Sequence, residues 1–342
     1  MEINVARVAL PLKKRFAVAK GSAEVKTNVL TILNNRYSGE ASGSVYYGPP
    51  VELIEVDIRK GIEFIKWLPR IDVSTLNSIT CLDILPIARS ALMGMVLNAI
   101  SGESGRYPWE ILGLGTPVGI RSSLTIGIDT HEVMKKAILE SPHAIIKLKL
   151  GHEQDCELLD VIKAVTDKEI RVDANGGWTC AKAEEMIYYL GKAGVTIVEQ
   201  PTEPEYSSEW PHLKKASPSV ELIIDEGLNR LEDYDQFKDS IDGVNIKMEK
   251  CGGILEGIRI ARQARTDKKK VMLGCMVESS IGIAQSVYMS SLADYCDLDG
   301  PLLLENDIAS GIVYQREYIK VDREIIGGPK LKRDLFDKYV QT

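Results

Sequence analysis

The pattern of hydrophobic and polar residues divides the chain into two unequal parts. The first 37 residues contain two strand-like runs, one of them Thr27–Leu33. Apolar residues then recur at three- and four-residue spacing over Val51–Leu68 and Leu82–Ile100, which predicts two helices. Strands followed by helices are typical of an α+β domain, and we assign residues 1–117 to it.

From residue 118 onward the pattern becomes repetitive. Short β-branched runs alternate with amphipathic segments such as Ala181–Leu190 and Gly253–Arg265. This alternation predicts βαβ units on a parallel sheet, and we assign residues 118–312 to this α/β domain. The runs expected as strands are Leu124–Ile128, Ala144–Leu148, Ile170–Asp173, Val195–Glu199, Leu222–Asp225, Gly243–Lys247 and Val271–Gly274.

Charged residues fall where these runs end. Five of them are separated by 24, 26, 26 and 22 residues, about one βα unit each. The strand ends of a (β/α)₈ barrel open on one face, which carries the active site, so these side chains are expected to converge. They are Lys149, Asp173, Glu199, Asp225 and Lys247, and Asp297 lies beyond the last run that reads clearly as a strand.

Three acids occupy the middle of this series. Asp173, Glu199 and Asp225 would repel one another in one pocket unless a cation neutralised them. Oxygen ligands without histidine or cysteine favour Mg²⁺, which keeps coordination positions for water or substrate. We therefore predict one Mg²⁺ ion held by these three residues.

Lysines flank the acids on both sides. Lys147 and Lys149 share one face of their strand, and Lys247 lies across the barrel. A metal with a lysine on either side is a layout for removing a proton from one face of a carbon and returning it to the other. A proton α to a carboxylate is barely acidic, and a divalent cation would stabilise the enediolate that its removal creates. We expect nearby positive charge and burial to lower the pKa of the basic lysine.

Composition narrows the classes of function. The 342 residues are 44% hydrophobic and 27% charged, with a net charge of −7, which disfavours nucleic acid as a partner. No run of 18 apolar residues suggests a membrane span, and the first residues do not read as a signal peptide. The six cysteines form no CxxC pair, so we expect reduced thiols and a cytoplasmic protein.

Together these motifs resemble the muconate-lactonizing-enzyme subgroup of the enolase superfamily. The matching segments are IKLKLG, DANGGW, VEQP, DEG, NIKMEKCGG and GCMVESSIG. The resemblance implies an enolase-type (β/α) barrel, with an α+β capping domain on which residues 313–342 return to pack. It also implies that Lys149 and Lys247 are the acid–base pair, that the three acids bind Mg²⁺, and that Lys147 contacts the substrate carboxylate.

The segment CDLDGPLLLEND is similar to the Asp-x-Asp motif of dipeptide epimerases. In that family the motif holds the free amine of a dipeptide, which implies this role for Asp297 and Asp299. Alternate spacing would put both carboxylates on one side of an extended segment. Thr125, Cys275, Met276 and Val277 fall where the family lines its substrate pocket.

The first loop departs from the family pattern. Where Ala-Glu epimerases carry an arginine for the glutamate side chain, this chain reads FAVAKGSAEV, with Lys20 near that place. The second residue of the dipeptide is therefore left open as acidic, apolar or basic.

Several activities compete on this resemblance. A dipeptide epimerase is favoured, because Asp297 and Asp299 would repel the dicarboxylate substrate of an o-succinylbenzoate synthase. An N-acylamino-acid racemase has no substrate amine to pair, and a non-catalytic Mg²⁺-binding scaffold would not need both lysines. A homo-oligomer is possible, and Glu278 and Glu305 are expected to be structural.

Overall fold

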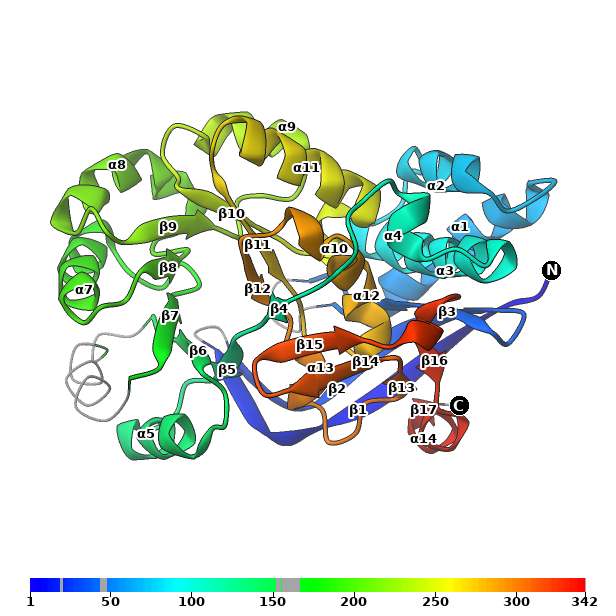
Figure 1. Cartoon of the computed structure of the whole chain (residues 1–342), viewed down its shortest axis with the longest axis horizontal. Helices are drawn as coiled ribbons and strands as arrows, with labels where there is room; N and C mark the ends of the chain where they lie inside the picture. Colours follow the sequence, from blue (N-terminus) through cyan, green and yellow to red (C-terminus); the bar gives the residue numbers. More distant parts are fainter. Residues whose placement is uncertain (19–20, 44–47, 152–154, 156–166, 342) are drawn as a thin grey trace.

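A computed structural model of the chain describes residues 1–18, 21–43, 48–151, 155 and 167–341 (Figure 1). Both ends of the chain contribute to one antiparallel sheet, in which Val8 of the first strand pairs with Val340 of the last. The sheet places the chain's final strand against the N-terminal domain. In spatial order its strands are β17 (Val340–Gln341), β1 (Ile3–Val18), β2 (Gly21–Leu33) and β3 (Tyr37–Ala41).

Helices pack on this sheet and connect it to the barrel. The predicted first helix is confirmed; the second begins later than predicted, at Pro86, since proline suits the first turn of a helix. An added Cβ at Gly39 would lie 1.9 Å from the Ala91 carbonyl oxygen, so the third strand and this helix approach more closely than a side chain allows. The helices are α1 (Val51–Trp67), α2 (Val73–Thr80), α3 (Pro86–Ser104) and α4 (Pro108–Ile111).

Among the described residues, eight parallel strands follow in sequential order around a barrel, so the predicted fold class is confirmed. A parallel bridge between Ser122 and Cys296 brings its first and last strands together. One strand was missed: Asp297 ends the eighth strand and does not lie beyond the sheet. The strands are β5 (Leu124–Ile126), β6 (Ile145–Lys149), β7 (Glu169–Asp173), β8 (Ile197–Glu199), β9 (Glu221–Ile224), β10 (Gly243–Ile246), β11 (Lys270–Gly274) and β12 (Tyr295–Asp297).

Helices between the strands surround the barrel (Figure 1). Their buried faces carry the apolar residues of the amphipathic segments, as in the predicted helix near residue 260, where Ile254, Ile258 and Ala261 are buried. The α-helices are α5 (His131–Glu140), α7 (Cys180–Lys192), α8 (Trp210–Leu213), α9 (Leu231–Phe237), α10 (Met248–Cys251), α11 (Ile254–Thr266), α12 (Ser280–Tyr288) and α13 (Gly300–Leu303), and 3₁₀ helices cover Pro204–Glu209, Lys214–Ala216, Ser290–Leu292 and Arg323–Ile325.

The last part of the chain crosses from the barrel back to the N-terminal sheet. A hairpin there pairs Ile319 with Ile120, just before the first barrel strand. Tyr339 then packs with Val8 and Leu10 of the sheet. The elements are β4 (Ile120–Arg121), β13 (Ala309–Ser310), β14 (Ile312–Gln315), β15 (Tyr318–Val321), β16 (Lys330–Leu331) and α14 (Arg333–Tyr339).

A buried carboxylate joins the N-terminal sheet to the barrel. Glu40 of β3 accepts hydrogen bonds from the backbone N–H groups of Ser279 and Gly282 at the start of α12, at 3.2 and 3.0 Å, and from the Ser279 hydroxyl. Anions are favoured at the N-terminus of a helix, and this one fixes the sheet over the mouth of the barrel.

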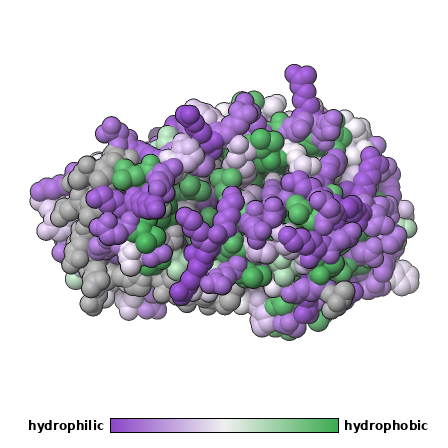
Figure 2. All heavy atoms as spheres, turned by 90° about the horizontal axis from the view of Figure 1, so that it is seen from below, coloured by the Kyte–Doolittle hydropathy of each residue, from purple (hydrophilic) through white to green (hydrophobic). Residues whose placement is uncertain are grey.

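Hydrophilic residues dominate the coloured surface in the view from below, and hydrophobic residues form small scattered groups there (Figure 2). Within the described part of the chain, every helix is too short or too polar to cross a membrane.

Candidate active site

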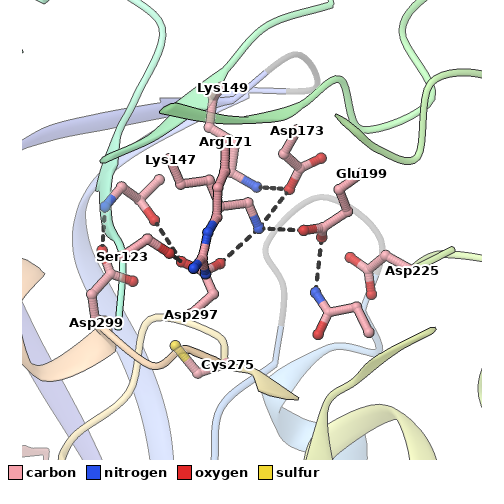
Figure 3. A network of polar contacts seen from close by, with 12 residues as sticks. Ser123, Lys147, Lys149, Arg171, Asp173, Glu199, Asp225, Cys275, Asp297 and Asp299 are labelled. Carbon is pink, nitrogen blue, oxygen red and sulfur yellow. Dashed lines mark hydrogen bonds and ion pairs between the residues drawn. The ribbon is translucent and has the colours of Figure 1, made fainter. Parts of the chain in front are cut away.

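Two lysines enter the barrel from β6. All five residues of this strand are buried, and Lys147 and Lys149 alternate with Leu148, so both ammonium groups lie on the same face. Lys147 is only 2% exposed and Lys149 9%. Figure 3 shows both within one network of polar contacts at the barrel mouth.

Lys147 lies at the centre of this network. Its Nζ lies 2.6 Å from Asp297 Oδ2, 2.7 Å from Glu199 Oε2 and 3.0 Å from Asp173 Oδ2. Burial alone would lower the pKa of this lysine, but the three carboxylates outweigh burial and raise the pKa well above its usual value. Lys147 is therefore a fixed cation among carboxylates from three strands.

The three predicted metal ligands come from adjacent strands. Asp173 and Glu199 end β7 and β8, Asp225 directly follows β9, and each is at most 1% exposed. The Gln200 side chain holds two of these strand ends together, because its Oε1 accepts a hydrogen bond from the Asp225 N–H at 2.9 Å. The convergence expected from the sequence register is present.

Lysines stand on both sides of the acids. Lys149 Nζ lies 2.5 Å from Asp173 Oδ2, and Lys247 Nζ lies 2.6 Å from Asp225 Oδ2. Their strands, β6 and the β10 that Lys247 follows, are four positions apart in the eight-stranded sheet, which places the two lysines across the barrel from each other.

The predicted lowering of the pKa of the basic lysine is not observed for Lys149. Burial lowers its pKa, but the neighbouring carboxylates, Asp173 first and then Glu199, together outweigh burial, and the net pKa is raised. Conversely, burial would raise the pKa of Asp173, but Lys147 and Lys149 hold it well below its usual range.

Two residues of the site were missed by sequence reasoning. Lys250 Nζ donates hydrogen bonds to both the side chain and the backbone carbonyl of Asp225. Asn245 Nδ2 donates to Glu199 Oε1 at 2.9 Å. Asn245 lies on the strand that precedes Lys247, and Lys250 follows one turn after Lys247, so their placement inside a recognised motif was the available signal.

Asp297 and Asp299 meet at Thr125, although not for the predicted reason. Asp299 does not continue the strand but lies at the start of α13, with φ −94° and ψ 6°. Its Oδ2 accepts a hydrogen bond from the Thr125 N–H at 2.5 Å, while Asp297 Oδ1 accepts from Ser123 Oγ at 2.7 Å. The middle residue of β5 and the residue before this strand therefore hold both carboxylates at one side of the mouth.

The other predicted pocket residues separate into different environments. Cys275 Sγ accepts a hydrogen bond from the Gly300 N–H at 3.3 Å, and Met276 lines a cavity beside Asp225. Val277 packs against the hydrophobic cluster under the N-terminal sheet, and its carbonyl oxygen accepts from Ser42 Oγ at 2.7 Å. Lys20 lies outside the described residues.

Two carboxyl groups of the site lie where negative charge is disfavoured. Burial, followed by repulsion from Asp173, raises the pKa of Glu199 to about 8. Burial, followed by repulsion from Asp297, raises the pKa of Asp299 to about 7. Each is therefore a place where a bound cation would be stabilised.

The donor set fits Mg²⁺ in kind. As the side chains stand, no three His, Cys, Asp or Glu residues of the described chain are grouped to hold a metal ion, and Asp173 and Asp225 are each bonded to a lysine. The donors are nevertheless buried carboxylate oxygens, the ligands that Mg²⁺ prefers.

With every group ionised, the site has a formal charge of −2, from four lysines and six acids: Lys147, Lys149, Lys247 and Lys250, and Asp173, Glu199, Asp225, Glu226, Asp297 and Asp299.

The chain matches known proteins over both domains. The family model described as "Enolase C-terminal domain-like" matches residues 129–323. The L-Ala-D/L-Glu epimerase of Bacteroides thetaiotaomicron is 33% identical over 279 residues, 80% of this chain and 72% of that protein. An L-Ala-D/L-amino acid epimerase of Maribacter sp. is 30% identical over 329 residues, 91% of this chain and 94% of that protein.

A solved structure shares the fold. The dipeptide epimerase from Cytophaga hutchinsonii, complexed with Mg and the dipeptide D-Ala-L-Val, superimposes with a TM-score of 0.85 at 23% identity, over 99% of this chain and 97% of the other. The resemblance seen in the sequence motifs is thus confirmed by the family match, by full-length relatives and by the fold. This chain belongs to the enolase C-terminal domain-like family, within the enolase superfamily and among its epimerases.

Proposed function

We propose that this protein is a Mg²⁺-dependent dipeptide epimerase that inverts the α-carbon of the C-terminal residue. The observation that carries the proposal is the placement of Lys149 and Lys247 on opposite strands, each bonded to a different one of the three central carboxylates. One lysine removes the α-proton and the other returns it to the opposite face. This pairing makes the reaction a 1,1-proton transfer through an enediolate.

Asp173, Glu199 and Asp225 would hold the metal. Bound there, Mg²⁺ supplies stabilisation for the negative charge that develops on the substrate carboxylate. Asp173 now raises the pKa of Lys149, so engaging that carboxylate elsewhere would lower the pKa of Lys149 and make it a better base. Lys147 would bind the substrate carboxylate, because the raised pKa of Lys147 keeps its side chain positively charged.

The substrate's free amine would lie at Asp297 and Asp299. Two carboxylates 6% and 3% exposed can make charge-assisted hydrogen bonds to an ammonium group, and the raised pKa of Asp299 marks a position where added positive charge is favoured. The names of the relatives from Bacteroides and Maribacter, an L-Ala-D/L-Glu epimerase and an L-Ala-D/L-amino acid epimerase, support a dipeptide as the substrate.

Two other reactions use the same lysines and acids. An o-succinylbenzoate synthase would bring a dicarboxylate toward Asp297 and Asp299, which would repel it. An N-acylamino-acid racemase would leave these two acids without a cationic partner. Both alternatives are therefore less compatible with the paired acids than a dipeptide is.

A mixed dipeptide library tests the proposal. Incubated with enzyme and Mg²⁺ in D₂O, epimerised dipeptides gain one deuterium, which mass spectrometry detects. We expect incorporation into free dipeptides and none into N-acyl amino acids or o-succinylbenzoate precursors. Exchange confined to N-acyl amino acids would instead establish the racemase.

A further inference from the structure

A cavity of about 470 Å³ opens beside the candidate catalytic centre, between the barrel and the N-terminal domain. Its size is within the range of roughly 300–1,000 Å³ that ligand pockets occupy. Leu85, Ile87 and Met276 contribute apolar wall, while Asp225 connects the cavity to the lysine at position 247. A side chain leaving an α-carbon near Lys247 has this space within reach.

One acid in the cavity wall has only another carboxyl group as its side-chain neighbour. Glu249 belongs to α10, two residues after Lys247, and is only 5% exposed. Among the described residues, its carboxylate oxygens have no side-chain hydrogen-bonding partner other than the adjacent carboxyl group of Glu278. A buried carboxylate left in this state is costly unless a cation or a donor reaches it.

The surroundings of Glu249 concentrate carboxyl groups. Burial, followed by the neighbouring Glu249, raises the pKa of Glu278 well above its usual value, and burial also raises the pKa of Glu249, so a cation bound beside the pair would favour its ionisation. Lys26 is the nearby cation from the sheet. Its Nζ donates to the Gly43 carbonyl oxygen, and burial lowers its pKa to about 8.

The other charged residues that line the cavity are three acids and one lysine: Glu203, Asp225, Glu226 and Lys250. Lys250, which also lines it, is bonded to Asp225 through both the side chain and the backbone of that residue. Glu226 adds a second carboxyl group, whose Oε1 accepts from Asn175 Nδ2 at 3.0 Å and whose Oε2 is buried with no hydrogen-bond partner among the described residues. The cavity thus combines apolar walls with two incompletely paired acids.

We propose that this cavity binds the cationic side chain of the residue that is epimerised, so that the substrates are dipeptides ending in lysine, arginine or a similar basic residue. The inference rests on the proposed function and names its substrate class. The apolar walls suit the methylene stem of such a side chain, and Glu249 and Glu226 suit its charged end. The dipeptide amine is assigned elsewhere, to Asp297 and Asp299 beside Thr125, so the two cations of the substrate have separate sites.

Matched substrates test this proposal with the intact enzyme and Mg²⁺. Epimerisation of L-Ala-L-Lys, L-Ala-L-norleucine and L-Ala-L-Glu would be followed by chiral chromatography. Norleucine lacks only the terminal ammonium group of lysine. We expect kcat/KM for the lysine dipeptide to exceed that for the norleucine dipeptide by about tenfold or more, with the glutamate dipeptide slowest.

The variant Glu249→Gln then tests whether Glu249 causes the preference for the lysine dipeptide. It should reduce the ratio of kcat/KM for the lysine dipeptide to that for the norleucine dipeptide about tenfold, while Glu132→Gln, an exposed glutamate on α5, leaves the ratio unchanged. Glu226→Gln provides a second variant if Glu249→Gln does not fold.

If kcat/KM for the norleucine or the glutamate dipeptide equals or exceeds that for the lysine dipeptide, the cationic site is overturned but the proposed epimerase function stands. If no free dipeptide is epimerised, the proposed function itself fails.

Discussion

Lys147 Nζ lies 2.6 Å from Asp297 Oδ2. The cation assigned to the substrate carboxylate is thus bonded to one of the two carboxylates assigned to the substrate amine. A dipeptide carries both opposite charges, so it can replace this internal ion pair with two new ones. A substrate that has the carboxylate but no amine would draw Lys147 away from Asp297 and bring no cation to replace it. This difference gives a physical basis for the selection of dipeptides.

The first prediction concerns the stability that Lys147 provides. Lys147→Met leaves Asp173, Glu199 and Asp297 without their shared cation, and removing one partner of a buried ion pair commonly costs about 3–5 kcal/mol. Urea unfolding in the presence of a chelator should show a loss of that size. Lys66→Met, which breaks an exposed pair with Glu63, should cost less than about 1 kcal/mol. Equal losses in the two variants would argue against the central role of Lys147.

The second prediction concerns metal and pH. The pKa of Glu199 is raised to about 8 in the folded protein, so its contribution to stability is present at low pH and is lost as the pH rises toward 8. Chelated enzyme should therefore melt at a lower temperature at pH 8 than at pH 6. Mg²⁺ competes with protons for the carboxylates, so it should raise the Tm more at pH 8. A Mg²⁺ effect that is absent, or larger at pH 6, would contradict the site.

The third prediction concerns the free amine. Asp297→Asn and Asp299→Asn each remove a buried charge that faces the substrate ammonium, a loss commonly worth about 2–5 kcal/mol. We expect kcat/KM for free dipeptides to fall roughly 30-fold or more in each variant. N-acetylation should reduce turnover by the parent enzyme to a similar extent. Full activity on N-acetyl dipeptides would remove the assigned role of these acids.

The fourth prediction concerns the pH dependence of substrate capture. The pKa of Asp299 is about 7, raised by burial and then by Asp297, so Asp299 is neutral at lower pH and attracts an ammonium group less. The value of kcat/KM for a free dipeptide should fall as the pH drops below about 7. In the Asp297→Asn variant, the decrease in the residual kcat/KM should occur at lower pH, because the negative charge of Asp297 no longer raises the pKa of Asp299. An unshifted profile would assign the titration to another group.

The sequence predicted the central residues well because their placement follows from one rule. Lys149, Asp173, Glu199 and Asp225 each lie at or just after the end of a barrel strand, so a regular spacing along the chain becomes convergence in space. The eighth strand escaped notice because its residues, Tyr295–Asp297, include none of the β-branched residues that mark the other barrel strands.

Contacts between distant loops could not be predicted in this way. Asp299 is positioned by the backbone of Thr125, and an added Cβ at Gly300 would lie 2.6 Å from the Met276 carbonyl oxygen. The proximity of Glu249 and Glu278 likewise depends on how α10 packs against the segment that precedes α12. Spacing within a motif contains no information about such contacts.

The central claim is that two lysines act on opposite faces of one carbon, and stereospecific exchange tests it most directly. Lys149→Ala and Lys247→Ala would each be incubated in D₂O and Mg²⁺ with the separate L,L and L,D forms of a dipeptide that the parent enzyme epimerises, and ¹H NMR would follow the α-proton. We predict that neither variant interconverts the epimers, and that each exchanges the α-proton of only one epimer, a different one for each variant. Epimerisation at the parent rate by either variant, or exchange of the same epimer by both, would contradict the two-lysine account.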